Sequence, residues 1–293
     1  MAQRQWTIKE LLRVTAEYLQ GKGVDSPRLS SEVLLAHLLQ VDRIRLYLDP
    51  EKPLQDDELA AYRVLVRRRA NREPLQHITG FQEFWSADFA VGPEVLIPRP
   101  ESELLVEQAI ETMGANPPDR NPKPFFLDLG TGSGALIISL GREFPEASLC
   151  ATDISMEAIR IARENARKHR LGERIEFVCG DLFTPFKPRV SPFDLVLTNP
   201  PYVASEVLDT LMPEIRFEPR VALDGGPGGM RYIERIIPDA ADFIRPGGWL
   251  LVEMDPSQIP TALELIERTG RYRHAKAVKD YSRRLRIVAA QLA

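Results

Sequence analysis

From Phe125 onward the chain alternates short apolar segments with longer helical patterns, and this alternation constrains the fold more than any other feature. Five apolar, β-branched segments have the composition of buried strands, namely FFLDLG, SLCATD, IEFVCGD, FDLVLTN and WLLVEM. Helical patterns near residues 135–143, 156–169, 231–243 and 260–268 lie between or after these strands, and HAKAV and LRIVAA add two more strands. Strands alternating with helices predict an α/β fold with a mostly parallel, doubly wound sheet.

A glycine-rich turn, DLGTGSGAL at residues 128–136, connects the first of these strands to its helix. Gly130, Gly132 and Gly134 let the backbone bend sharply and let a ligand approach it, because they carry no Cβ. With Ala135 after Gly134, the spacing also nearly meets the dinucleotide-binding pattern G-x-G-x-x-G/A. The turn indicates a nucleotide-type site, with a tight turn that binds nothing as the alternative.

Polar residues also stand at the ends of the next three strands. Asp153 ends the second strand, where a carboxylate can accept hydrogen bonds from both ribose hydroxyls. Asp181 ends the third strand and suits an exocyclic adenine amine, with Leu182 beside the ring, and Asn199 ends the fourth. Because open α/β sheets bind ligands at the carboxyl ends of their strands, these residues predict an adenosine site.

The fourth strand ends in TNPPY, residues 198–202, which is suited to holding a planar NH₂ group. A conjugated nitrogen is a poor nucleophile, so its lone pair must be turned toward the activated methyl group that it attacks. The side-chain oxygen of Asn199 can accept one N–H and the carbonyl of Pro200 the other. Pro200 and Pro201 fix φ, and the Tyr202 ring can pack on the flat substrate group. Such positioning contributes up to about 7–11 kcal/mol, so NPPY is predicted to clamp an amide or amine.

The chain before this region divides into two parts. Residues 1–75 are predicted to form a small all-helical domain, which begins with a capping box at Thr7 in TIKELLRVTAEYLQGKG. Residues 76–98 change to aromatic and β-branched alternation, which predicts a hairpin-like connector. The α/β domain then occupies residues 99–293.

Composition and charge exclude several classes of protein. A net charge of −4 and a pI near 5.7 argue against holding nucleic acid by bulk electrostatics. The basic cluster of Arg67, Arg68, Arg69 and Arg72 is interpreted as a solvated helix end, with an acidic partner as the alternative. Cys150 and Cys179 cannot make a disulfide framework and are predicted to be buried thiols, and no Cys/His spacing predicts a metal site. Because no apolar run suits a signal core or a membrane span, we expect a cytoplasmic protein.

Taken together, these motifs resemble class I S-adenosylmethionine-dependent methyltransferases, and more narrowly the bacterial peptide-chain release factor glutamine methyltransferase (PrmC/HemK) family. The resemblance runs nearly from end to end, through SSEVLLAHLL, PLQHITGFQEFW, VLIPRPESELLVEQAI, FEPRVALDGGPGG and KDYSRRLRIV, and LIPRPES is the most family-specific part. It implies a Rossmann-like, seven-stranded methyltransferase domain, preceded by a helical domain and a β-hairpin connector. It also implies methylation of the glutamine side-chain nitrogen (N5) in the Gly-Gly-Gln loop of class I release factors.

The resemblance assigns roles to particular residues. The expected S-adenosylmethionine contacts are Gly130, Thr131, Gly132, Ser133, Gly134, Asp153, Asp181, Leu182 and Asn199. The expected catalytic clamp is Asn199, Pro200, Pro201 and Tyr202, with no metal. The helical domain is expected to recognise the release factor, without direct contact with nucleic acid or membrane.

Four positions depart from the family pattern. Ser102 stands where the family often has threonine, which keeps the hydroxyl. Asp255 stands where glycine is expected, and Arg283 and Leu285 stand where glycine and aspartate are common, so local turns are affected there. Arg99, between two prolines, either contacts substrate or locks the domain junction.

Other functions share part of this pattern. DNA adenine N6-methyltransferases also use Asn-Pro-Pro-Tyr, but they extrude a base and usually carry a basic recognition domain. A glutamine methyltransferase of a ribosomal protein shares the same motifs. A non-catalytic cofactor-binding module would not require an intact clamp. Hydride transfer by an NAD-dependent oxidoreductase would not require NPPY.

Overall fold

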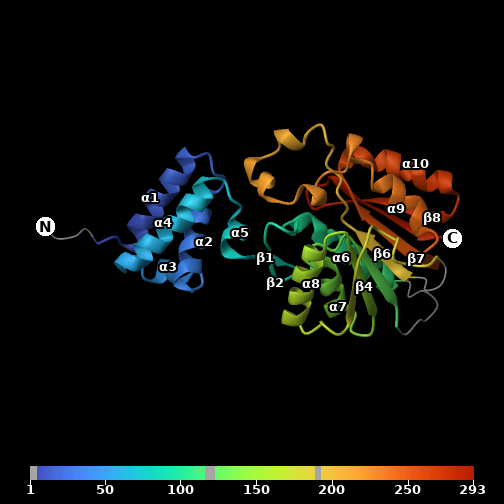
Figure 1. The fold of residues 1–293 in the computed structure, drawn as a ribbon, viewed down its shortest axis with the longest axis horizontal. Helices are drawn as coiled ribbons and strands as arrows, with labels where there is room; N and C mark the ends of the chain where they lie inside the picture. Colours follow the sequence, from blue (N-terminus) through green and yellow to red (C-terminus); the bar gives the residue numbers. More distant parts are fainter. Residues whose placement is uncertain (1–4, 116–122, 189–192) are drawn as a thin grey trace. The chain divides into compact units, whose positions relative to one another are not determined.

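The computed structural model describes residues 5–115, 123–188 and 193–293 (Figure 1). The chain forms two compact units. The smaller unit comprises Met1–Phe81 and Met212–Phe217, and the larger unit comprises Gln82–Leu211 and Glu218–Ala293. A short segment from the second half of the chain therefore belongs with the N-terminal helices.

The smaller unit is a set of α-helices around one apolar core. Its helices are α1 (Ile8–Gly21), α2 (Pro27–Leu39), α3 (Arg45–Leu48), α4 (Asp56–Ala70) and α5 (Leu75–Thr79). The predicted capping box is present, since the Thr7 hydroxyl accepts from the Glu10 N–H and the Glu10 carboxylate accepts from the Thr7 N–H. Tyr62 is buried in the core, and its hydroxyl donates to the Ser31 carbonyl at 2.9 Å.

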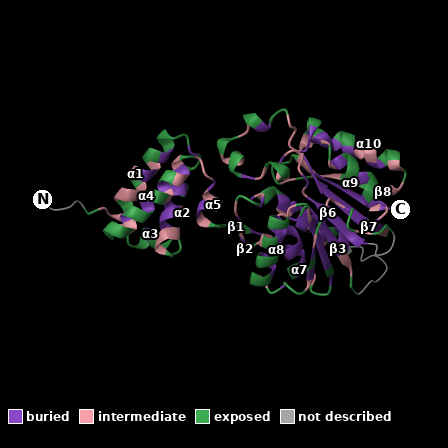
Figure 2. Cartoon of the chain, in the orientation of Figure 1, coloured by how far each residue is buried: buried purple, intermediate pink, exposed green. Residues whose placement is uncertain are grey.

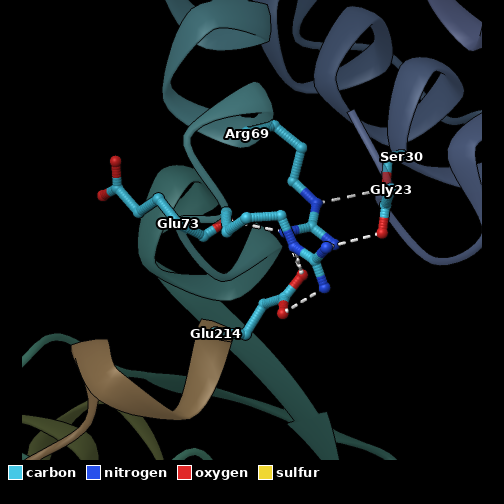
Figure 3. Close-up of polar contacts among 6 residues, drawn as sticks. Gly23, Ser30, Arg69, Glu73 and Glu214 are labelled. Carbon is cyan, nitrogen blue, oxygen red and sulfur yellow. Dashed lines mark hydrogen bonds and ion pairs between the residues drawn. The ribbon is translucent and has the colours of Figure 1, made fainter. Parts of the chain in front are cut away.

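Glu214 fastens the 3₁₀ helix η4 (Pro213–Phe217) to this unit through two arginines (Figure 3). Arg72 donates to both carboxylate oxygens at 2.7 Å, and Arg69 donates to Oε1 at 3.0 Å. Burial acts to raise the pKa of Glu214, but the hydrogen bonds from Arg72 and Arg69 outweigh it and lower that pKa. The interpretation of the basic cluster as a solvated helix end was therefore wrong at these two positions, because their acidic partner lies far along the same chain.

A β-hairpin opens the larger unit, with strands β1 (Phe81–Phe84) and β2 (Ala87–Ala90). Phe84 and Phe89 are almost fully buried in the core of this unit. The backbone N–H of Trp85 donates to Glu103 Oε1, and that of Ala90 donates to Asn165 Oδ1, both at 2.7 Å. These contacts bind the hairpin to the α/β core.

A seven-stranded sheet forms the centre of the larger unit, in the order β5-β4-β3-β6-β7-β9-β8 (Figure 1). Its strands are β3 (Phe125–Leu129), β4 (Ser148–Asp153), β5 (Ile175–Cys179), β6 (Phe193–Thr198), β7 (Ile244–Glu253), β8 (Tyr272–Lys279) and β9 (Leu285–Leu292). The first five strands in this order are mutually parallel, and β9 runs antiparallel to both β7 and β8. The predicted fold class and all seven predicted strands are thus confirmed.

Helices cover both faces of the sheet (Figure 2). The inner strands are largely buried, whereas the edge strands β5 and β8 are partly exposed. The α-helices are α6 (Glu103–Ala115), α7 (Ala135–Glu143), α8 (Met156–Lys168), α9 (Ile233–Ala240) and α10 (Ile259–Thr269). One core contains residues of α6, α7 and α8, and the other contains residues of α9 and α10. Successive strand residues alternate between them, since Phe126 joins the first core and Leu127 the second.

Short 3₁₀ helices lie in the loops: η1 (Pro100–Ser102), η3 (Leu208–Thr210), η5 (Arg220–Ala222), η6 (Pro227–Gly229) and η7 (Pro256–Gln258). Asp255 caps η7, because its carboxylate accepts from the Ser257 N–H at 2.9 Å, so this departure from glycine supplies a cap. Arg283 has a φ of +63°, a backbone conformation that favours glycine. Cys150 is buried as predicted, but Cys179 is exposed, because β5 is an edge strand.

We expect Glu214→Gln to lower the free energy of unfolding of the smaller unit by about 2 kcal/mol, since it leaves buried Arg69 and partly buried Arg72 without a carboxylate. Urea denaturation measures this loss, and faster tryptic cleavage at Arg216 reports release of η4. The matched control is Glu17→Gln, which breaks an exposed pair with Arg13 and should cost less than about 0.5 kcal/mol. Equal losses in the two variants would contradict the anchoring role of Glu214.

Candidate active site

A pocket in the larger unit opens at the carboxyl edge of the sheet. Four neighbouring parallel strands, β3 to β6, each end at it. The strand ends and the turns after them contribute Leu129, Gly130, Gly132, Asp153, Gly180, Asp181, Leu182, Thr198, Asn199, Pro200 and Pro201. This is the position where open α/β sheets bind ligands.

The glycine-rich turn after β3 forms one wall of the pocket. Gly130, Gly132 and Gly134 have φ values of +71°, +54° and +82°, which side chains with a Cβ rarely adopt. A Cβ on Gly130 or Gly132 would meet no atom within 4 Å, so the space beside this backbone is open. The turn can therefore admit a ligand against its backbone.

A buried carboxyl group supports this turn from below. Asp128, at the end of β3, is fully buried, and its Oδ2 accepts from the Thr131 hydroxyl at 2.7 Å. The Thr131 N–H donates to the Thr152 carbonyl at 2.8 Å, which ties the turn to β4. Ser133 is buried, and its carbonyl accepts from Asn165 Nδ2 at 2.8 Å. Thr131, Ser133 and Gly134 thus shape the turn from outside the pocket lining.

Asp153 ends β4 and lines the pocket. Its Oδ2 accepts from the Gly132 N–H and its Oδ1 from the Ser155 N–H, both at 2.9 Å. Burial raises the pKa of Asp153, and these backbone hydrogen bonds act against that rise. Each carboxylate oxygen can accept more than one hydrogen bond, so the fixed carboxylate can still accept from ligand hydroxyls.

Asp181 and Leu182, which follow β5, also line the pocket. Leu182 has a φ of +49°, so its backbone turns sharply at this point. Asp181 Oδ2 accepts from Arg235 Nη2 at 2.6 Å, an ion pair that the sequence analysis did not include. Tyr232, which precedes α9, also lines the pocket.

Asn199 stands at the carboxyl end of β6. Just before it, the Thr198 hydroxyl donates to the Leu129 carbonyl at 2.7 Å, which joins the ends of β6 and β3. Asn199 Nδ2 donates to Ser102 Oγ at 2.9 Å. With its amide nitrogen bonded to Ser102, Asn199 has Oδ1 as its side-chain acceptor, and the residue lines the pocket together with Pro200 and Pro201.

Tyr202 lies behind this pocket wall. Its hydroxyl donates to Glu253 Oε1 at 3.3 Å, and its carbonyl accepts from Gln258 Nε2 at 2.8 Å. A Cβ on Gly229 would come within 2.1 Å of the Tyr202 carbonyl oxygen, so only glycine permits this close packing. Tyr202 itself is absent from the pocket lining.

The pocket also contains residues that the sequence analysis did not select. Among them are Glu94, Val95 and Leu96 from the segment after the hairpin, and Pro219, Val221 and Ala222 from the loop after NPPY. Both segments lie within or next to VLIPRPES and FEPRVALDGG, two stretches that carry the family resemblance. That resemblance was the sequence feature that could have pointed to these residues. Glu253 could have been predicted as a site residue in the same way as Asp153, because it is a carboxylate at the end of a buried strand.

Arg99 is paired inside the larger unit. Its Nη2 donates to Glu218 Oε1 at 2.5 Å, and the Ile97 N–H donates to Glu218 Oε2 at 2.9 Å. Glu218 is buried and adjoins Pro219 of the pocket wall. Arg99 therefore joins the segment before η1 to the loop after NPPY.

Two buried carboxyl groups have strongly altered acidity. Burial raises the pKa of Asp128 to about 7 and that of Glu253 to about 7. Hydrogen bonds from the Ser102 and Tyr202 hydroxyls act in the opposite direction on Glu253. Among the described residues, no group of three or more His, Cys, Asp and Glu side chains could hold a metal ion. No helix in the described ranges is long and apolar enough to cross a membrane.

The sheet order and the pocket define a Rossmann-like class I methyltransferase fold. The hMettl16 catalytic domain has this fold, with a TM-score of 0.58 and 16% identity over 95% of this chain and 91% of that one. A methyltransferase from Pyrococcus furiosus gives a TM-score of 0.52 and 18% identity over 77% of this chain and 98% of that one.

Sequence comparison identifies the family within this class. Residues 10–80 match the family of the PrmC N-terminal domain, and residues 103–217 match the methyltransferase small domain. The release factor glutamine methyltransferase of Geobacter sulfurreducens is 44% identical over 90% of each chain. The one from Rhodopirellula baltica is 37% identical over 98% of this chain and 97% of its own. The chain belongs to the release factor glutamine methyltransferase family.

We expect stability to depend on pH through Glu253. Between its ordinary pKa near 4.5 and about 7, the folded chain retains a proton that the unfolded chain has released. The free energy of unfolding should therefore fall as the pH rises through this range, by up to about 3 kcal/mol, and level off above it.

Glu253→Gln removes this dependence, while Asp128 remains in both proteins and its effect cancels. Urea denaturation of both proteins at pH 5 and pH 8 measures the difference. The free energy of unfolding of the variant minus that of the wild type should be larger at pH 8 than at pH 5. A difference between the two proteins that is independent of pH would contradict the raised pKa of Glu253.

Proposed function

We propose that this protein transfers a methyl group from S-adenosylmethionine to the side-chain amide nitrogen (N5) of the glutamine in the Gly-Gly-Gln loop of class I release factors. Family membership over nearly the whole chain supports this activity. The observation that carries it is Asn199, whose amide nitrogen is bonded to Ser102 and whose oxygen is its side-chain acceptor at the pocket. An acceptor at this position suits a substrate NH₂ group.

The pocket residues fit S-adenosylmethionine. The open backbone at Gly130 and Gly132 would accommodate the amino acid part, and Asp153 would accept from the ribose hydroxyls. Asp181 and Leu182 would hold the adenine, with Thr131, Ser133 and Gly134 shaping the turn. When bound, this cofactor supplies an electrophilic methyl group on sulfur.

The NPPY residues orient the nucleophile. Asn199 Oδ1 accepts one N–H of the substrate amide and the Pro200 carbonyl accepts the other, so the nitrogen lone pair is directed away from both. Pro200 and Pro201 lack N–H groups and cannot compete as donors. Tyr202 holds the motif from behind through Glu253 and Gln258. No base is needed before attack, because the amide proton becomes acidic only as the new bond forms.

The domains divide this work. We assign recognition of the release factor to the helical domain, residues 1–75, and place the hairpin connector at residues 76–98 and the methyltransferase domain at residues 99–293. Membership of the PrmC N-terminal domain family supports the first assignment. The reaction requires neither a nucleic acid nor a membrane, and we expect it to take place in the cytoplasm, where release factors act.

Asp153→Ala should weaken S-adenosylmethionine binding about 10- to 100-fold, because it removes charge-assisted hydrogen bonds to the ribose. Isothermal titration calorimetry measures the affinity directly. Glu176→Ala is the control, since it removes an exposed carboxylate from β5, outside the pocket. If Asp153→Ala kept wild-type affinity, the ribose would have to bind elsewhere.

Asn199→Ala should lower kcat on the order of 100-fold, because it removes one of two acceptors that orient the amide. Cofactor affinity should change less. Normal turnover by the variant would exclude the clamp.

The substrate is tested with methyl-labelled S-adenosylmethionine, offered separately with a class I release factor, ribosomal protein and duplex DNA. Mass spectrometry of the digested product should locate the label on the Gly-Gly-Gln glutamine. Label only on ribosomal protein or adenine would overturn the proposed substrate.

A further inference from the structure

The clamp depends on which way the Asn199 carboxamide faces. The oxygen and nitrogen of a carboxamide are nearly the same size, so both orientations fit the same space. One orientation presents the Oδ1 acceptor to the substrate NH₂, and the other presents Nδ2, a donor facing a donor. The productive orientation must therefore be selected by the groups on the other side of Asn199.

Ser102 is the group that contacts Asn199 on that side. Its Oγ accepts from Asn199 Nδ2 at 2.9 Å, and Ser102 is only 4% exposed. Its backbone N–H donates to the Arg99 carbonyl at 3.0 Å, which fixes the residue at the end of η1. A serine hydroxyl can either donate or accept, however, so Ser102 alone would tolerate both orientations of the amide.

Glu253 removes this ambiguity. It is 1% exposed at the end of β7, and an ionised carboxylate can only accept hydrogen bonds. Oε1 accepts from the Tyr202 hydroxyl, while buried Oε2 has no hydrogen bond of standard geometry in the described part of the chain. Hydrogen bonding from the Ser102 hydroxyl also lowers the pKa of Glu253 against the effect of burial. Ser102 is therefore drawn to donate toward Glu253, which leaves its oxygen as an acceptor.

We propose that Ser102 and Glu253 are positioning residues that hold the Asn199 carboxamide with Oδ1 toward the substrate. In this arrangement the hydrogen bonds run in one direction: the Asn199 amide donates to Ser102, and the Ser102 hydroxyl is directed toward the Glu253 carboxylate. Tyr202 donates to the same carboxylate, so one buried group supports both ends of the NPPY motif. This inference rests on the proposed clamp and identifies what fixes its polarity.

The test compares Ser102→Ala, Ser102→Thr and Ser139→Ala with the wild type, using a class I release factor as substrate. Ser102→Ala should lower kcat about tenfold with little change in S-adenosylmethionine affinity by calorimetry. Ser102→Thr keeps the hydroxyl and should restore kcat to within about threefold. Ser139→Ala is the control: it removes another buried hydroxyl, bonded to the Ala135 carbonyl in α7, and should leave kcat unchanged.

A double variant separates this inference from the proposed clamp. If Ser102 acts only through Asn199, then Ser102→Ala in the Asn199→Ala background should cause no further loss of kcat. A normal kcat for Ser102→Ala would overturn the inference, and so would a full additional loss of kcat in the double variant. A low kcat for Asn199→Ala would support the clamp in either case. A normal kcat for Asn199→Ala would overturn the clamp itself.

The pH dependence tests the part assigned to Glu253. Its surroundings are Ser102, Tyr202, Arg286, which pairs with Asp280, and Glu101, whose charge raises the pKa of Glu253. Protonated Glu253 can itself donate to Ser102, so the direction of the chain is no longer fixed below pH 7. The ratio of wild-type kcat to Ser102→Ala kcat should therefore fall toward one between pH 8 and pH 6. A ratio independent of pH would contradict the role of Glu253.

Discussion

The parallel pairing of β3 with β4 and β6 is the constraint on which the site depends. Parallel strands end at the same edge, so the glycine turn, Asp153 and the NPPY motif meet there although they are distant in sequence. The Thr198 hydroxyl reinforces this pairing by donating to the Leu129 carbonyl, where the two motif-bearing strands lie side by side. A slip of register by one residue would turn Asn199 away from the pocket, because side chains alternate between the faces of a strand.

Two buried carboxyl groups at this edge show how a sheet can hold polar turns rigidly. Asp128, next to the last residue of β3, lies beneath the glycine turn, and Glu253 ends β7 behind NPPY. An ionised carboxylate only accepts hydrogen bonds, so each one dictates the direction in which neighbouring hydroxyls donate. Burial works against ionisation and raises both pKa values to about 7. The rigidity of the site is thus obtained at some cost in stability at neutral pH.

The sequence predicted the sheet well because buried parallel strands are continuous apolar runs, and it predicted the pocket walls because such strands end at one edge. Gly130, Asp153, Asp181 and Asn199 all line the pocket. Contacts between segments far apart in the chain could not be predicted in this way. Neither the pairing of Arg72 with Glu214 nor that of Arg99 with Glu218 has a local pattern, since each depends on where a loop folds back.

The loop after NPPY explains why these distant ion pairs matter. Beyond Tyr202 it reaches Glu214, which is held by arginines of the helical unit, and then Glu218, which is held by Arg99. It continues through Pro219, Val221 and Ala222 of the pocket wall to Gly229, which packs on the Tyr202 carbonyl. The same loop therefore begins and ends at the NPPY motif, and between these points Glu214 and Glu218 each form ion pairs with arginines. Because a long loop has high conformational entropy, the ion pair between Arg99 and Glu218, within the larger unit, supplies order that a pocket wall made from a loop would otherwise lack.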